Sequence, residues 1–131
     1  LGSPKLISYL NAVKYSFNSY TLSYAALMLG VEAIRDREYF EETREKIIAT
    51  RAWSGRELER LGFFCTDSKA NFIFAAHKRA AARDIFEALK EKNIYVRHFQ
   101  KARIDNYLRI SIGTQTEMET LVRCLEAYLK C

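Results

Sequence analysis

Residues 107–117 have the sequence YLRISIGTQTE and are the most informative part of the chain. Apolar and polar residues alternate as far as Ile112, which is typical of a β-strand with one buried face. Gly113 interrupts the alternation, and Thr114 with Glu117 has the spacing of a helix capping box. The residues that follow are apolar at helical spacing. This stretch therefore predicts a strand that leads directly into a helix.

Strand-like alternation and helix-like spacing of apolar residues also recur in the rest of the chain. The second half has further short strand patterns and one more helix, whereas the first half has only helical patterns. Strands are predicted at 63–65, 71–76, 94–97 and 107–112, and helices at 4–14, 27–34, 38–60, 81–92 and 115–130. Gly62 ends the long charged helix. The pattern predicts an α+β fold: a small mixed or antiparallel sheet of three to four strands, covered by helices and preceded by long helices.

Composition limits the functional classes. The chain has 131 residues, of which 49% are hydrophobic and 28% charged, and its net charge is +5. This indicates one globular domain, or a piece of a larger protein, and the missing initiator Met favours the piece. No apolar run approaches the ~18 residues of a membrane span, so we expect no membrane partner. Basic residues alternate with acidic ones along the long helix, so we expect no nucleic-acid partner.

Cysteine and histidine positions give no metal-ligand pattern. The three cysteines are Cys65, Cys124 and Cys131, and their odd number and spacing predict free thiols in a reducing compartment. His77 and His98 are predicted to lie in surface loops and do not cluster with the cysteines. We therefore expect no metal site. The chain also lacks a glycine-rich phosphate loop and a nucleophile elbow, so no catalytic residue is predicted in it.

Two arginines are the best candidates for ligand binding. In the last strand the side chain of Arg109 points away from the face of its apolar neighbours, and Arg97 does the same in the strand before it. If these strands are neighbours, both guanidinium groups could converge on one anion, because the planar fork of arginine binds carboxylate or phosphate at two points. The alternative is that both are solvated surface residues. Asn71, which opens a strand, is by itself typical of a turn or an edge.

Several strings, in this order, make the chain similar to the C-terminal portion of the histidinol-phosphate aminotransferases. These enzymes are fold-type I, pyridoxal-phosphate (PLP)-dependent aminotransferases. The strings are YFEETREKII at 39–48, LGF at 61–63, SKANFI at 68–73, IYVR at 94–97 and YLRISIGT at 107–114. The similarity covers essentially all of the chain. The ANF and LRISIGT strings, at this separation, are fairly specific to this branch.

The resemblance implies a function for the full-length protein. Such enzymes are cytoplasmic homodimers that transfer an amino group from glutamate to imidazole-acetol phosphate, which gives 2-oxoglutarate and histidinol phosphate in histidine biosynthesis. The family's Schiff-base lysine lies in a motif upstream of this chain's first residue, and none of the nine lysines here is in that motif. We therefore expect this chain alone to be inactive and to bind no PLP.

The resemblance also implies site residues and domains. Arg109 matches the arginine that receives the anionic end of the substrate, and Arg97 matches a second arginine of that pocket. Asn71 matches a strand-start residue at the cleft, and Tyr20, in the loop Asn18-Ser19-Tyr20 between domains, is a further candidate substrate contact. Residues 1–36 would be helices of the junction between large and small domain, and residues 37–131 the small domain.

Three alternatives remain open. Threonine-phosphate decarboxylases and aromatic aminotransferases use a similar small domain, so the chain could belong to either. A third, different class is a stand-alone α+β module that senses a small ligand. The reading frame upstream of Leu1 would separate a PLP enzyme from such a module, because a Ser-x-x-Lys cofactor motif followed by a Gly-Leu-Arg-like string would indicate a PLP enzyme.

Overall fold

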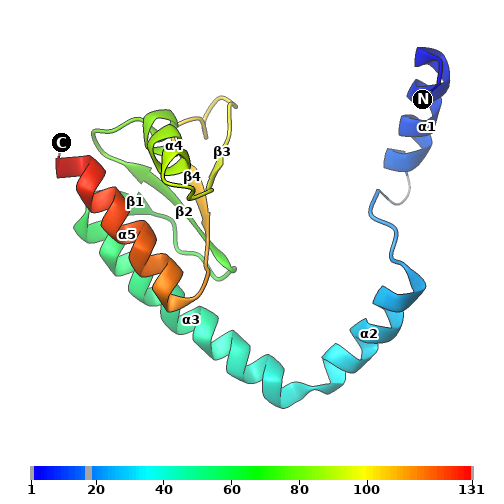
Figure 1. Cartoon of the computed structure of the whole chain (residues 1–131), viewed down its shortest axis with the longest axis horizontal. Coiled ribbons are helices and arrows are strands. Elements are labelled where there is room, and N and C mark those ends of the chain that lie inside the picture. Colours follow the sequence, from blue (N-terminus) through cyan, green and yellow to red (C-terminus); the bar gives the residue numbers. More distant parts are fainter. Residues whose placement is uncertain (1, 17–18, 131) are drawn as a thin grey trace. The chain divides into compact units, whose positions relative to one another are not determined.

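The computed structural model describes residues 2–16 and 19–130. Within these residues the order of elements is α1 (Pro4–Ser16), α2 (Tyr24–Arg35), α3 (Arg37–Arg60), β1 (Phe63–Cys65), β2 (Phe72–His77), α4 (Ala82–Glu91), β3 (Arg97–His98), β4 (Leu108–Ser111) and α5 (Gln115–Lys130) (Figure 1). The chain separates into two compact units, Leu1–Phe40 and Glu41–Cys131. None of the helices in the described ranges is both long and apolar enough to cross a lipid bilayer.

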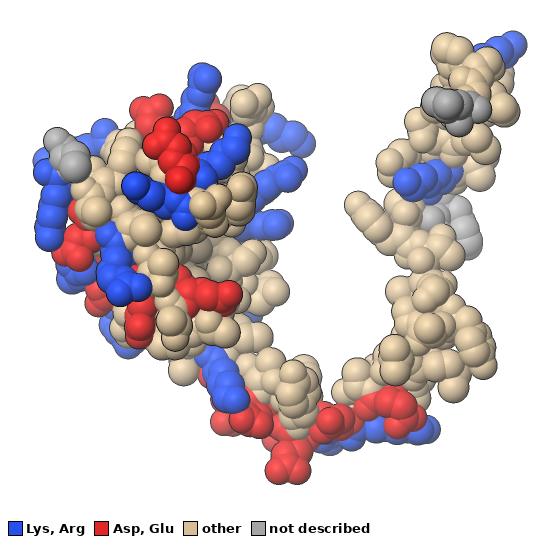
Figure 2. Space-filling view, viewed as in Figure 1, with Lys and Arg blue, Asp and Glu red and all other residues tan. Residues whose placement is uncertain are grey.

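The first unit consists of two capped helices without a core. The backbone N–H of Leu6 donates to Ser3 Oγ at 3.3 Å, and that of Ala26 donates to Ser23 Oγ at 3.2 Å, so a serine caps the N-terminus of each helix. No residue of α1 or α2 is buried. Val13 and Ile34 are 72% and 79% exposed, and Figure 2 shows that few residues of these helices carry charge. The predicted helices are present, but their apolar faces are uncovered within this unit.

The second unit contains a four-stranded sheet with the order β1-β2-β4-β3. Each neighbouring pair is antiparallel, and the register places Ile73 opposite Ile110 and Phe74 opposite Arg109. The predicted α+β fold is confirmed, and the sheet is antiparallel throughout. The predicted capping box at the start of α5 is also present: the N–H of Thr114 donates to Glu117 Oε2 at 2.7 Å, and the N–H of Glu117 donates to Thr114 Oγ1 at 3.4 Å.

The strand predicted at 94–97 is shorter and later than expected, since β3 comprises only Arg97 and His98. The end of α4 explains the difference. Asn93 has a positive φ of 58°, which turns the chain, and the N–H of Ile94 donates to Leu89 O at 2.9 Å. That amide closes the helix and is not available to the sheet. The side chain of Ile94 still packs against the core.

One face of the sheet is covered by helices. Leu108 and Ile110 are each 1% exposed, which confirms their predicted core face. They belong to a single cluster with side chains from β1, β2, α3, α4 and α5, which includes Leu58, Phe63, Ile73, Ala75, Ile85, Leu89, Met118, Leu121 and Leu125. The opposite face of the sheet carries the strand side chains that alternate with the core residues, such as Arg109 in β4.

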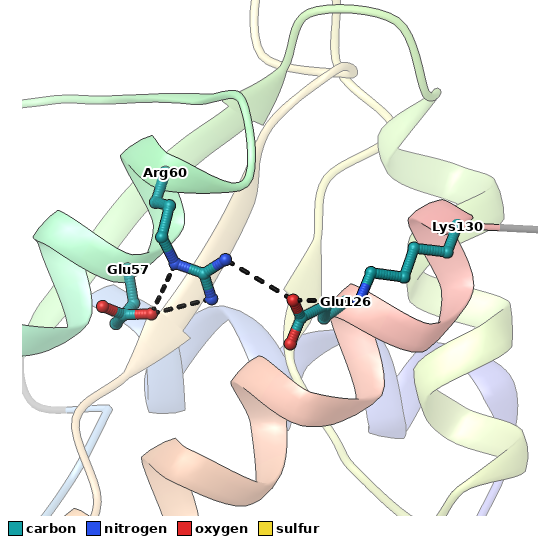
Figure 3. Close-up of polar contacts among 4 residues, drawn as sticks. All are labelled: Glu57, Arg60, Glu126 and Lys130. Carbon is teal, nitrogen blue, oxygen red and sulfur yellow. Dashed lines mark hydrogen bonds and ion pairs between the residues drawn. The ribbon is translucent and has the colours of Figure 1, made fainter.

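An ion-pair network joins the C-terminal ends of α3 and α5 (Figure 3). Arg60 Nη2 lies 2.9 Å from Glu57 Oε2, and Arg60 Nη1 lies 3.5 Å from Glu126 Oε1. Lys130 Nζ lies 3.2 Å from the same Glu126 oxygen. The hydrogen bond from Lys130 is the main reason that the pKa of Glu126 is lowered, and the hydrogen bond to Glu57 is the main reason that the pKa of Arg60 is raised. Arg60 is exposed and Glu126 is half-buried at the surface, so solvent screens this network and it adds little to stability.

Two histidine predictions are wrong. His77 is not in a surface loop but is the buried last residue of β2. Its Nδ1 accepts the backbone N–H groups of Arg79 at 3.3 Å and Ala80 at 2.9 Å, so Nε2 carries the proton and donates to Leu61 O at 3.1 Å. His98 is a strand residue, half-buried, with Nε2 2.7 Å from Asp105 O.

Cys65 and Cys124 are free thiols, as predicted, and Cys131 lies outside the described residues. Burial, with a smaller contribution from Glu59, raises the pKa of the Cys65 thiol to about 11. Among the described residues, no group of three or more His, Cys, Asp or Glu side chains is placed to hold a metal ion.

Candidate anion-binding site

The two candidate arginines lie side by side on the sheet. Arg97 of β3 and Arg109 of β4 are direct partners in the antiparallel register, and both side chains are exposed. Directly opposed residues of an antiparallel pair share a face, with their Cβ atoms about 4.5–5.5 Å apart. This is the face opposite to Leu108 and Ile110. The two strands are neighbours, which is the condition for both guanidinium groups to converge on one anion.

The electrostatics of this pair favour an anion. Like charges directly opposite each other destabilise a sheet. In residues 2–16 and 19–130, no carboxylate forms an ion pair with either guanidinium group. A bound carboxylate or phosphate would offset the repulsion and accept hydrogen bonds from both forks. The arrangement is therefore chemically suited to an anion.

Aromatic side chains surround the arginines. Arg109 Cζ lies 5.5 Å from the ring centroid of Phe72, and Arg97 Cζ lies 5.7 Å from that of Phe99. Phe74 stacks on Tyr107, with ring centroids 4.6 Å apart and an angle of 8° between the planes, and it meets Phe99 edge-on at 6.2 Å. The Phe72 and Phe99 rings thus lie within the usual range of a cation–π contact with the two guanidinium groups.

The other two candidates lie away from this pair. Asn71 precedes β2, and the alternation of that strand places it in phase with Ile73, on the helix-covered side, although it is exposed. Its carbonyl accepts the N–H of Ile112 at 2.9 Å, which closes the strand end. Tyr20 belongs to the first unit and is 89% exposed there. Asn18 of the same loop lies outside the described residues.

Sequence reasoning missed the aromatic partners of the site. Phe72 and Phe74 occupy the non-core positions of β2, where a solvated strand usually carries polar residues. Large aromatic residues at these positions are the sequence feature that could have indicated contacts with the arginines. Phe99 has no such signal, because it follows the two-residue strand β3 and only the tertiary structure brings it to Arg97.

Comparison with known proteins identifies the family. Residues 1–125 match the family described as aminotransferase class I and II. The chain belongs to this family. It is 52% identical over 118 residues to the histidinol-phosphate aminotransferase of Clostridium acetobutylicum, an alignment that covers 90% of this chain and 34% of that protein. The chain thus spans about a third of the length of the curated aminotransferases it matches.

Solved structures show the same fold. The histidinol-phosphate aminotransferase of Sinorhizobium meliloti, solved in complex with pyridoxal-5'-phosphate, superposes with a TM-score of 0.76 at 24% identity over 91% of this chain and 34% of that one. A decarboxylase from Sulfurospirillum multivorans superposes with a TM-score of 0.72 at 23% identity over 98% of this chain and 38% of that one. The aminotransferase fold of this segment is therefore shared by enzymes with different names.

The residues described here do not fit a complete cofactor site for a class I and II aminotransferase. A lysine that forms an imine with PLP has to be desolvated or held beside another cation, so that its amine is free to attack. All nine lysines of the chain are exposed. What this part of the aminotransferase offers is the arginine pair and its aromatic surroundings, which suit an anion and not an aldehyde.

Proposed function

We propose that this chain supplies the small domain and the substrate-anion site of a histidinol-phosphate aminotransferase. Residues 37–131 would form that domain, and residues 1–36 the helices of its junction with the large domain. The complete enzyme would be a cytoplasmic homodimer that uses PLP to exchange the amino group between glutamate and imidazole-acetol phosphate. The observation that carries the proposal is the direct cross-strand pairing of Arg97 and Arg109, without a carboxylate partner in the described residues.

In this proposal Arg109 holds the anionic end of the substrate, either the α-carboxylate of glutamate or the phosphate of histidinol phosphate. Arg97 supports it from the neighbouring strand. Asn71 and Tyr20 are secondary candidates for substrate contact. PLP would supply the electron sink and would be bound by residues outside this chain, so the role of these side chains is to bind and orient the substrate.

A chimeric enzyme tests the proposal. The matching segment of the Clostridium acetobutylicum aminotransferase would be replaced by this chain, and steady-state rates measured with glutamate and histidinol phosphate. We expect Arg109→Ala to lose a charge-assisted contact worth about 1.5–3 kcal/mol, which is about 10- to 150-fold in kcat/KM. Arg109→Lys should recover part of the loss, since an ammonium group lacks the fork. Arg97→Ala should cost less.

The control is Arg83→Ala, because Arg83 is an exposed arginine of α4, on the helix-covered side of the sheet. Arg83→Ala should leave the kcat/KM for glutamate, the kcat/KM for histidinol phosphate and the melting temperature unchanged. Wild-type kcat/KM in Arg109→Ala would contradict the proposal. Loss of activity that follows loss of folding would make Arg109 a structural residue.

The same chimera addresses the alternatives. The likeness to the decarboxylase concerns the fold, whereas the 52% identity is to a histidinol-phosphate aminotransferase. Release of CO₂ from threonine phosphate above the level of the parent enzyme would favour the decarboxylase. A folded chimera that holds PLP but transfers no amino group would favour a ligand-sensing module.

A further inference from the structure

Phe72 has a defined geometric relation to Arg109. The register pairs Phe74 with Arg109 and Phe72 with Ser111, so Phe72 is the diagonal neighbour of Arg109 on the same face of the sheet. Diagonal neighbours in antiparallel strands are within reach of aromatic and long side chains. The guanidinium carbon lies 5.5 Å from the ring centroid, within the usual range of a cation–π contact.

Arg109 needs such a contact because little else fixes its side chain. The guanidinium group is exposed and has another guanidinium group as its direct cross-strand neighbour. No hydrogen bond or ion pair from its side chain is formed within the described residues. A free arginine side chain loses considerable rotamer entropy when it binds a ligand. The Phe72 ring, half-buried on a paired strand, restricts that freedom before the ligand arrives.

We propose that Phe72 is a positioning residue that holds the Arg109 guanidinium group in the orientation that receives the substrate anion. The inference rests on the proposed function of Arg109. Phe99 makes a similar contact with Arg97. It also packs edge-on against Phe74, so a substitution of Phe99 would disturb a second aromatic contact. The described residues give Phe72 no ring contact with another aromatic side chain, which makes it the cleaner probe.

The first test uses kinetics of the chimeric holoenzyme. Phe72→Leu keeps an apolar side chain but removes the ring, and we expect the KM for glutamate to rise about 3- to 20-fold. The kcat should stay within about 2-fold, because the contact serves ground state and transition state alike. Phe72→Tyr keeps the ring and should behave like the wild type. Phe64→Leu is the matched control: Phe64 lies on the same face in β1, is 55% exposed and has no cation contact in the described residues.

A double-mutant cycle separates positioning from a structural role. In an Arg109→Ala background, Phe72→Leu should cause no further rise in KM, because the residue it acts through is gone. An equal rise in both backgrounds, or a Phe72→Leu enzyme no different from Phe64→Leu, would overturn the inference while the anion site stands. An Arg109→Ala enzyme with unchanged KM and kcat would instead refute the proposed function.

A measurement without catalysis uses the 131-residue chain. An aromatic ring next to Arg109 should shift its side-chain Nε–Hε NMR signal upfield. Phe72→Leu should remove that shift, whereas Phe64→Leu should leave it. An Arg109 signal that is the same in Phe72→Leu and the wild type would show that the ring does not hold the guanidinium group, whatever the kinetics of the chimera.

Discussion

His77 is the residue at which the tertiary structure adds most to the sequence. Its ring joins the end of α3, through Leu61 O, to the loop after β2, through the N–H groups of Arg79 and Ala80. Its ring also packs edge-on against Phe63, with centroids 4.9 Å apart. All three backbone groups are satisfied by one side chain, so His77 acts as a structural connector and not as a candidate for acid–base chemistry.

We expect His77→Leu to lower the free energy of unfolding by about 1–3 kcal/mol, because it leaves partly buried backbone donors and an acceptor without partners. Urea denaturation of the 131-residue chain measures this. Lys78→Ala, at the exposed next position, is the control and should change stability by less than about 0.5 kcal/mol. Equal midpoints for His77→Leu and the wild type would show that water replaces the lost hydrogen bonds.

At the scale of elements, two glycines of the α3 region have opposite roles. Gly62 follows α3 with a φ of +92°, and a Cβ there would lie 3.1 Å from His77 Nε2. Gly55 lies inside α3, and a Cβ there would have no neighbour within 4 Å. The first glycine is required by backbone conformation and by the close approach of His77, whereas the second only weakens the helix.

The two positions therefore predict changes of opposite sign. Gly62→Ala should lower the free energy of unfolding by about 1–3 kcal/mol, because a side chain is strained in this conformation. Gly55→Ala should raise it by about 0.5–1 kcal/mol, because alanine favours a helix. Thermal and urea denaturation of both variants compares them directly. A loss of stability in Gly55→Ala would indicate a packing contact at that position.

At the scale of the whole molecule, the core belongs to one unit. Every buried residue of the described ranges lies between Thr50 and Leu125, and α1 and α2 contribute none. Isolated helices of 13 and 12 residues are marginal in water. The division between Phe40 and Glu41 therefore separates a unit with its own core from one that exposes apolar side chains.

We expect a shortened chain of residues 36–131 to melt within about 3 °C of the full chain, since it keeps the whole core. Beginning at Asp36 retains the cap of α3, because the N–H of Tyr39 donates to Asp36 Oδ1 at 3.2 Å. Binding of an apolar fluorescent dye should fall with the loss of exposed side chains such as Val13 and Ile34. A much lower melting temperature would show that residues 1–35 stabilise the second unit.

The sequence determined the local features of this protein. Alternation in 107–112 predicted which side of the sheet Leu108 and Arg109 occupy, and the capping box predicted the start of α5. These signals depend on residues a few positions apart, so they can be found without a fold. The same reasoning failed at 94–96, because the positive φ of Asn93 diverts the Ile94 amide to the end of α4.

Only the tertiary structure decided what the arginines face. The sequence placed Arg97 and Arg109 on outward faces of two strands, but their direct pairing depends on strand order and register. The contact of Phe72 with Arg109 spans 37 positions along the chain, and it exists because β2 and β4 are antiparallel neighbours in one register. A shift of one residue would reverse the faces, so the site is a property of the assembled sheet.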